Sequence, residues 1–335
     1  MLDCPIPVLR PGIDYQDPIL LTGSCFTEHI GNTLLDLKFK VLQNPNGILF
    51  DPASVGASII AWMENRPFEA SQLFYHNELW QSWQHHSIFS GLDQEEVLRR
   101  IDTAQAQAHA FLKSAKWLII TLGSSFSYRL TTTAAAAPSA SQCPPGTPVA
   151  NCHRTPAAWF NKHMMAIEET NAIFDECLLR LFAFNPKIQV IFTVSPVRHI
   201  RDGVVENNRS KARLIEVVHH LAGKFNGVHY FPAYELVIDV LRDYRFYDID
   251  MVHPNYSATG FVLEKFTENL VEPAARSLME EIRRIVTARR HKPFQPATQA
   301  HQRFLREQQS KTEDLQRRYP FLDLGEEIAW FRQSH

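Results

Sequence analysis

The chain has 335 residues, 45% of them hydrophobic, which is enough for one large domain or two ordinary domains with a sizeable core. A formal net charge of −2 argues against a nucleic-acid partner, and the absence of a long apolar run argues against a membrane span. Five cysteines without a Cys-x-x-Cys pair, behind an N-terminus that does not resemble a signal peptide, predict reduced thiols and a cytoplasmic location.

Apolar runs typical of strands alternate with segments of helical spacing along the first 290 residues. The first run, 18–22, stops at Gly23-Ser24 and leads into apolar residues spaced for one face of a helix. Strands separated by helices indicate a parallel sheet with helices on both faces, an α/β fold. Further strands are expected at 39–42, 117–122, 188–194 and 228–231, and helices at 27–38, 54–64, 93–114, 166–184, 208–226, 234–242 and 258–290.

Three segments depart from this alternation. Residues 66–92 alternate apolar and polar side chains around a turn at Asn77-Glu78, which predicts a β-rich insertion. Residues 131–148 are of low complexity and predict a mobile loop. We therefore expect one catalytic-type domain over 1–290 and a polar helical appendage over 291–335, which is suited to contacts between copies of the chain.

Side chains with catalytic potential follow the ends of the expected strands. Ser24 follows the first strand, and the loop from Asp250 to Pro254 precedes the last helix of the domain. Because the carboxyl ends of parallel strands gather at one edge of a sheet, Ser24 can meet His253 there. A serine hydroxyl needs a base to become a nucleophile, and the imidazole of that base needs a carboxylate partner. Asp250 is the predicted partner of His253, with Asp248 as the alternative.

Each of these residues also has a simpler interpretation. Ser24 could be the N-cap of the helix that follows it, and Cys25 is a rival nucleophile that we expect to be a core residue instead. His85 and His86 fit the wall of the inserted hairpin, and Arg198 fits either an anion site or a brace for its loop. Metal binding is not expected, because the cysteines and histidines lack the closely spaced pairs that zinc prefers.

Taken together, the motifs of the chain resemble the GSCFA domain family from about residue 15 to 270. The resemblance rests on Gly-Ser-Cys-Phe at 23–26, Asn44-Pro45-x-Gly47, Thr121-Leu122-Gly123, Asn151-Cys152-His153, Thr193-Val194-Ser195-Pro196-Val197-Arg198, Ser210-Lys211, Tyr230-Phe231-Pro232-Ala233-Tyr234-Glu235, Leu241-Arg242-Asp243-Tyr244-Arg245-Phe246-Tyr247 and Asp250-x-x-His253-Pro254. That family is grouped with the SGNH/GDSL hydrolases. The resemblance therefore implies a three-layer α/β/α, flavodoxin-like fold with a parallel central sheet.

The resemblance also implies roles for individual residues. Ser24 would be the nucleophile, with Asp250 and His253 as the other members of a triad, and the backbone N–H groups of Ser24 and Gly47 would bind the oxyanion. Related hydrolases add an Asn from a Gly-x-Asn turn. Here the matching turn is Gly123-Ser124-Ser125, and Asn151 is our expected substitute.

The expected function is hydrolysis of an O-acyl ester, such as an O-acetyl carbohydrate, through an acyl-enzyme and without a cofactor. The alternatives are an O-acyltransferase that uses the same acyl-enzyme, and a catalytically silent glycan-binding domain. The missing Gly-x-Asn turn is the observation that supports the silent domain. Further side chains are candidates for contacts with a small-molecule or carbohydrate ester: His86, Ser125, His153 and Arg198.

Overall fold

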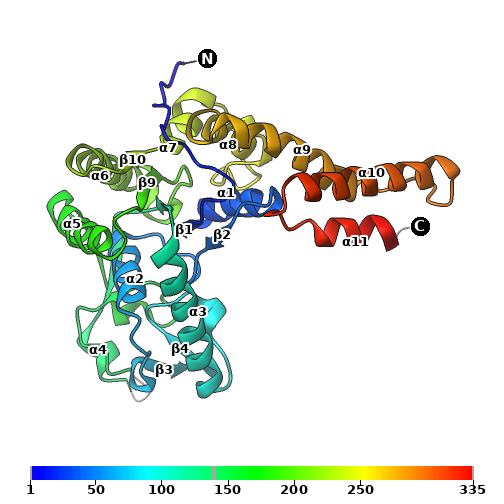
Figure 1. Cartoon of the computed structure of the whole chain (residues 1–335). Helices are drawn as coiled ribbons and strands as arrows, with labels where there is room; N and C mark the ends of the chain where they lie inside the picture. The colour runs from blue at the N-terminus through cyan, green and yellow to red at the C-terminus, as the bar shows by residue number, and fades with distance from the viewer. Residues whose placement is uncertain (1, 138–140, 334–335) are drawn as a thin grey trace. The chain divides into compact units, whose positions relative to one another are not determined.

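The computed structural model describes residues 2–137 and 141–333. The chain forms two compact units (Figure 1). The first consists of Met1–Ile6, Pro18–Gly31 and Leu42–Glu264, and the second of Pro7–Asp17, Asn32–Val41 and Lys265–His335. Over the described ranges, no helix is both long enough and apolar enough to cross a bilayer.

A five-stranded sheet forms the centre of the first unit. Its strands are β1 (Ile19–Gly23), β2 (Val41–Gln43), β5 (Trp117–Leu122), β9 (Gln189–Val194) and β10 (Val228–Tyr230), in the order β10-β9-β5-β1-β2. The pairs β1/β5, β5/β9 and β9/β10 are parallel. Numbered within the sheet, this order is 2-1-3-4-5, the flavodoxin-like order that the resemblance implies. The strand order reverses between β1 and β5, which is where such folds bind ligands.

Helices cover both faces of this sheet. On one face, α2 (Pro52–Glu64), α3 (Gln94–Ser114), α5 (Ile167–Phe184) and α6 (Gly203–Lys224) share a core with Leu20, Ile120 and Phe192 of the strands. In Figure 1 these helices follow one another from α3 through α2 and α5 to α6. The residues that alternate with these along the strands, and so face the other side of the sheet, are also buried. They include Ile19, Leu21 and Ile119. Burial on both faces explains why the strands are continuous apolar runs, and the three-layer α/β/α fold is confirmed.

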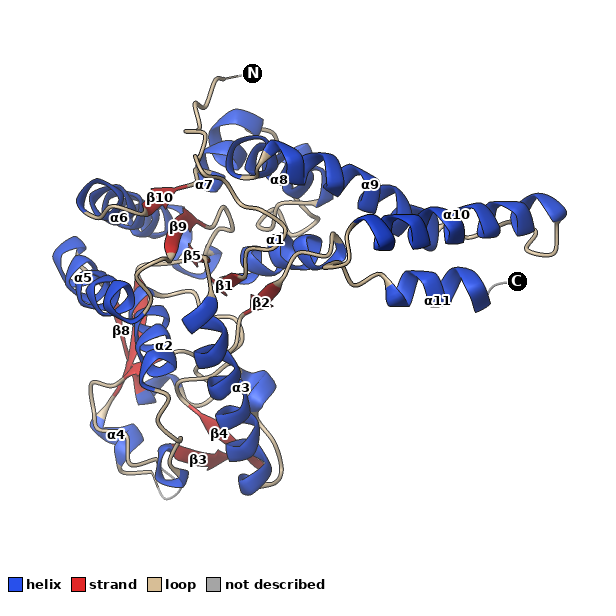
Figure 2. Ribbon diagram, viewed as in Figure 1, coloured by secondary structure: helices blue, strands red, loops and turns tan. Residues whose placement is uncertain are grey.

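Two smaller sheets stand apart from the central one in Figure 2. The hairpin β3 (Leu73–His76) and β4 (Leu79–Ser82) turns at Asn77 and Glu78, both of which have positive φ, as the alternation of the insertion predicts. The other sheet contains β6 (Phe126–Leu130), β7 (Pro148–Val149) and β8 (Phe160–Met164). The sequence did not indicate β8. Of the expected mobile loop, 131–148, residues 138–140 lie outside the described residues, and α4 (Thr132–Ala135) lies within it.

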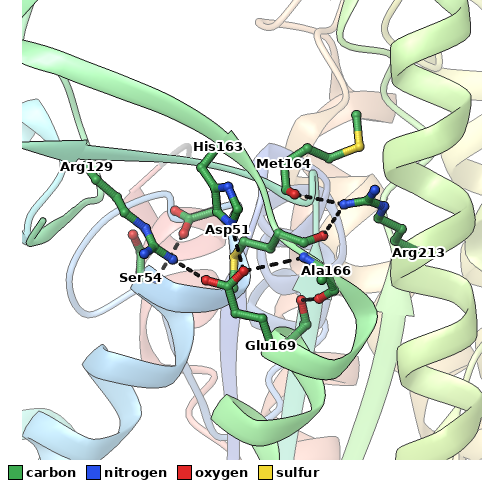
Figure 3. A network of polar contacts seen from close by, with 10 residues as sticks. Asp51, Ser54, Arg129, His163, Met164, Ala166, Glu169 and Arg213 are labelled. Atoms are coloured by element: carbon green, nitrogen blue, oxygen red, sulfur yellow. Dashed lines mark hydrogen bonds and ion pairs between the residues drawn. The ribbon is translucent and has the colours of Figure 1, made fainter.

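A polar network joins this second small sheet to α5 (Figure 3). Arg129 of β6 and His163 of β8 both bind the carboxylate of Glu169 in the first turn of α5, with His163 Nε2 2.6 Å from Glu169 Oε2. Arg213 of α6 donates to the carbonyls of Met164 and Met165 at 2.8 and 2.7 Å. The long excursion between β5 and α5 is therefore fastened to two helices of the α/β core.

The second unit is mainly helical. It contains α9 (Pro273–Arg290), α10 (Gln299–Arg318) and α11 (Gly325–Gln333). Tyr15 stacks on Phe39 with ring centroids 4.1 Å apart. The nearly buried carboxylate of Glu327 is neutralised by Lys38 at 2.9 Å and by Arg289 at 2.8 Å, which satisfies the rule that buried charges are paired.

Two expected helices have different bounds. The segment 258–290 is two helices, α8 (Tyr256–Leu270) and α9, because Pro273 disfavours helical geometry at the residue before it. The short helix at 234–242 is α7 (Ala233–Glu235) followed by a π-helix over Leu236–Leu241. The remaining helix near the site, α1 (Cys25–Asp36), begins directly after Ser24.

Candidate functional site

Ser24 lies at the corner between β1 and α1, at the point where the strand order reverses. Gly23 has φ +142°, and a Cβ atom added there would lie 2.2 Å from the carbonyl oxygen of Thr121, so the corner requires glycine. The Ser24 N–H donates to that same oxygen at 3.1 Å. The Ser24 carbonyl accepts from Thr27 N–H at 2.8 Å and starts the helix. The backbone of Ser24 is therefore held by the sheet on one side and by α1 on the other.

The hydroxyl of Ser24 does not cap this helix. Ser24 is 5% exposed. Its Oγ atom is buried and has no hydrogen-bond partner among the described residues. An N-cap serine would instead accept a hydrogen bond from the first turn of the helix. A buried hydroxyl left without a partner is costly, and such groups in native proteins call for an explanation. The capping interpretation of this side chain is therefore wrong, and its hydroxyl is available for another role.

The loop before α8 brings Asp250 and His253 together. Asp250 Oδ2 lies 2.6 Å from His253 Nδ1, while Asp250 Oδ1 accepts from the N–H groups of Val252 and His253 at 2.9 and 3.0 Å. Met251 takes φ +58°, which closes the turn. Asp248, the alternative partner, contributes its backbone N–H to the His253 carbonyl at 2.8 Å. Asp250 is therefore the carboxylate that contacts this imidazole.

These contacts define the protonation of the pair. Hydrogen bonds from the His253 backbone and side chain lower the pKa of Asp250 to about 2. An ionised carboxylate only accepts hydrogen bonds, so Nδ1 of His253 is the nitrogen that donates to it, and in the neutral imidazole Nε2 is an acceptor. Both side chains are close to half exposed, at 47% for Asp250 and 45% for His253. The loop thus presents an imidazole of defined orientation to solvent.

Among the described residues, no hydrogen bond joins Ser24 Oγ to His253. The two residues belong to the same unit, but His253 is exposed whereas Ser24 Oγ is buried and bonded to no described residue. Catalytic hydrogen bonds are often long without substrate and shorten in the reacting complex. The triad of Ser24, Asp250 and His253 therefore stays a prediction.

Two of the expected oxyanion donors are already in use. The N–H of Ser24 donates to Thr121 O, and the N–H of Gly47 donates to Asn44 O at 2.7 Å inside its own turn. Asn151 closes a local turn as well, with its Oδ1 accepting from His153 N–H at 2.8 Å. No contact places Asn151 beside Ser24 among the described residues. These bonds weaken the expected assignment of the oxyanion hole to Ser24, Gly47 and Asn151.

The turn Gly123-Ser124-Ser125, which replaces Gly-x-Asn, is fastened into the protein. Ser210 of α6 accepts from the N–H of Ser125 at 2.8 Å, and its Oγ lies 3.1 Å from Ser125 Oγ and 3.2 Å from Ser124 Oγ. Ser125 is fully buried. The expectation that Ser125 contacts a substrate is therefore corrected, because its hydroxyl faces a helix of the core.

Sequence reasoning assigned no role to the neighbouring Lys211, although it noted the Ser210-Lys211 pair. Lys211 is 1% exposed, and its Nζ donates to the carbonyls of Gly123 at 2.5 Å and Ser195 at 2.6 Å, which follow β5 and β9. Burial lowers its pKa to about 7. Its spacing could have revealed it, since Lys211 shares the buried stripe of α6 with Ser210 and Leu214.

Most of the candidate histidines are buried. His153 is 8% exposed, its Nε2 lies 2.7 Å from the Ser82 carbonyl oxygen, and burial lowers its pKa to about 4. His85 is also buried, with Nδ1 2.8 Å from Ser82 Oγ and a pKa lowered by burial to about 3. The burial of His85 favours the hairpin-wall interpretation of that residue. His86 is partly exposed, and its Cβ occupies the space that a Cβ at Gly47 would need.

Cys25 and Arg198 are both partly exposed. Burial is the largest effect on Cys25, and its pKa is raised, so the thiol is protonated rather than a reactive thiolate. This favours Ser24 over Cys25 as nucleophile, although Cys25 is less enclosed than a core residue would be. Arg198 lies within electrostatic range of both Lys211 and Tyr234, which puts it beside the strand-end loops.

Over the described residues, no group of three or more His, Cys, Asp or Glu side chains could hold a metal ion. A hollow of about 900 Å³ is lined only by residues of the second unit, from α9 and α10 and between them, and therefore contains none of the candidate residues.

Comparison with known proteins places the chain in a family. No curated protein matches it. A solved structure described as "a putative platelet activating factor from Streptococcus pneumonia" is 10% identical, covers 76% of this chain and 84% of its own, and has a TM-score of 0.38. A model of the C-terminal domain of GSCFA domain proteins matches residues 282–334, and the GSCFA family model matches residues 18–266. Because this last match spans most of the chain, including the Ser24 corner and the Asp250–His253 loop, the chain belongs to the GSCFA family.

Proposed function

We propose that this chain is a serine esterase of the SGNH type that removes an acyl group from an oxygen atom. The observation that carries the proposal is the Asp250–His253 pair, whose 2.6 Å contact leaves an acceptor nitrogen on an exposed base. The unpartnered hydroxyl of Ser24 at the reversal of strand order supports it. Five free thiols are compatible with work in a reducing compartment, such as the cytoplasm.

In the proposed reaction, His253 Nε2 takes the proton of Ser24 Oγ as that oxygen attacks the acyl carbon. The imidazolium, stabilised by Asp250, then donates this proton to the departing alcohol. Water next attacks the acyl-enzyme with His253 again as base, which releases the acid and restores Ser24. The loop must bring His253 to Ser24 for these steps, and its exposed position leaves room for such a movement.

The test compares wild type with Ser24→Ala on p-nitrophenyl acetate. Loss of the nucleophile is expected to reduce kcat by a factor on the order of 10⁶ relative to the active enzyme. A fluorophosphonate should label the wild type at Ser24 and leave the variant unlabelled. Equal hydrolysis by the two proteins, with no label on Ser24, would disprove the esterase.

One set of observations favours a second candidate, the catalytically silent glycan-binding domain. The N–H groups of Ser24 and Gly47 are already bonded, and no described residue forms a hydrogen bond with Ser24 Oγ. A silent domain would bind an acetylated oligosaccharide without consuming it and would not react with the fluorophosphonate. Labelling of Ser24 without turnover of esters in water would instead favour an O-acyltransferase.

A further inference from the structure

Asn44 holds a spare hydrogen-bond donor next to the nucleophile. Its N–H donates to Leu21 O at 2.8 Å, its carbonyl accepts from Gly47 N–H at 2.7 Å, and its side-chain Oδ1 accepts from Gly23 N–H at 3.1 Å. The residue is 9% exposed, and its side-chain Nδ2 is buried without a partner among the described residues. We propose that Asn44 Nδ2 is the side-chain donor of the oxyanion hole, an inference that rests on the proposed function.

The orientation of the Asn44 amide is determined by its neighbour. The N–H of Gly23 can only donate, so the oxygen of the amide must face it and the NH₂ group must point elsewhere. Flipping the amide would set two donors against each other. The unpartnered atom is therefore the nitrogen, which is the donor that an oxyanion needs.

The position of Asn44 suits this role. Asn44 continues the β2 side of the sheet past the end of the strand, because it binds Leu21 through its backbone and Gly23 through its side chain. The same Gly23 accepts from Leu49 N–H at 3.0 Å. Ser24, the next residue, binds Thr121 on the β5 side. The Asn44 side chain thus lies on the β2 side of Gly23 and the Ser24 backbone on its β5 side. Asn44 Nδ2 and Ser24 Oγ are both buried atoms without a hydrogen-bond partner among the described residues.

The other asparagine of the same turn shows what a structural amide looks like. Asn46 Nδ2 donates to Ser58 Oγ at 3.1 Å, and Asn46 Oδ1 accepts from Trp62 Nε1 at 2.9 Å. Both ends of that side chain are satisfied, as is usual for buried amides. Asn44 is equally buried but has only one end satisfied. A donor held ready in a buried site stabilises the developing charge of the tetrahedral intermediate without reorganisation.

The experiment compares Asn44→Asp with Asn46→Asp on p-nitrophenyl acetate. Asp at 44 keeps the shape and the acceptor toward Gly23 but removes the donor. We expect kcat to fall by about 10²–10³-fold with KM little changed, the typical loss for one oxyanion donor. Asn46→Asp should lower the thermal unfolding midpoint through its lost bond to Ser58 and keep a kcat near that of wild type. Wild-type kcat in folded Asn44→Asp would overturn the assignment.

A measurement on the wild type removes any dependence on how the variant folds. The protein is phosphonylated at Ser24 with a fluorophosphonate and crystallised, since the phosphonyl oxygen imitates the oxyanion. A hydrogen bond from Asn44 Nδ2 to that oxygen is expected, and its absence overturns the inference. If the fluorophosphonate does not react with Ser24, the proposed esterase has failed, and Asn44 has no oxyanion to bind. The two failures are therefore distinguishable.

Discussion

The Ser24 corner and the Asp250–His253 loop belong to the same unit but are built in opposite ways. The corner is buried, and its backbone is fixed by segments that are distant in sequence, through Thr121, Asn44 and Leu49. The loop is exposed, and the bonds that orient His253 come from Asp250 in the same turn. The proposed nucleophile thus depends on the whole sheet, whereas the proposed base depends on its own loop. Substitutions that disturb the backbone of the corner should therefore affect stability, whereas substitutions in the loop should affect activity alone.

After Ser24→Ala, the largest effect is expected from Asp250→Asn. The amide oxygen would keep the bonds to the N–H groups of Val252 and His253, and its NH₂ group would face Nδ1 of the imidazole. The proton of His253 would then move to Nε2, where it blocks removal of the serine proton. We expect kcat on p-nitrophenyl acetate to fall by about 10²–10⁴-fold, with the unfolding midpoint unchanged.

Asp248→Asn is the matched control for this substitution, because Asp248 uses its backbone rather than its carboxylate toward His253. It should hydrolyse the ester at the wild-type rate. A large loss in Asp248→Asn together with a small loss in Asp250→Asn would show that the loop rearranges before it acts.

Gly23→Ala should have the next largest effect, which is a loss of stability. Its Cβ would lie 2.2 Å from Thr121 O at a φ of +142°, so the strand end must shift. We expect a loss of about 3 kcal/mol or more in the free energy of unfolding, measured with urea. Gly223→Ala is the control, since nothing lies within 4 Å of its added Cβ in α6, and it should stabilise by about 0.5–1 kcal/mol. Equal stabilities would mean that the corner is not rigid.

The smallest expected effect comes from Lys211, which should make the free energy of unfolding depend on pH. Burial lowers its folded pKa to about 7, whereas an unfolded lysine titrates near 10.4. The unfolded chain therefore binds more protons above pH 7, and this residue should make stability rise by up to about 1.4 kcal/mol for each pH unit. Lys211→Gln should remove this slope between pH 7 and about 8.5. Lys224→Gln, in the same helix but exposed, should keep it. If Lys211→Gln leaves the slope of stability against pH unchanged, Lys211 is not the source of that slope.

The main elements of the fold were predictable because they follow from local rules. Continuous apolar runs identified β1, β5 and β9. The helix expected over 93–114 is α3, and Asp93 caps it, with its side chain accepting from Glu96 N–H at 2.7 Å. β8 was missed because its FNKHM sequence lies partly exposed and lacks an apolar run. The break at Pro273 was readable from the sequence but was overlooked.

The candidate site was predictable where chemistry and sequence spacing coincide. Asp250 and His253 are close in sequence, so their contact needed no knowledge of the fold. The hydrogen bonds of Asn44 and Lys211 join loops that only the folded sheet brings together, and spacing alone does not show them. Burial of Ser125 was likewise set by Ser210, a residue far along the chain.

A turn that orients its own histidine also has an evolutionary consequence. Since Asp250 binds the backbone and the ring of His253 within one loop, insertions or deletions elsewhere in the chain leave their pairing intact. Such a segment can be inherited, exchanged or grafted as a single piece. Lineages that reshape the rest of the surface to suit new substrates would then not need to rebuild the base.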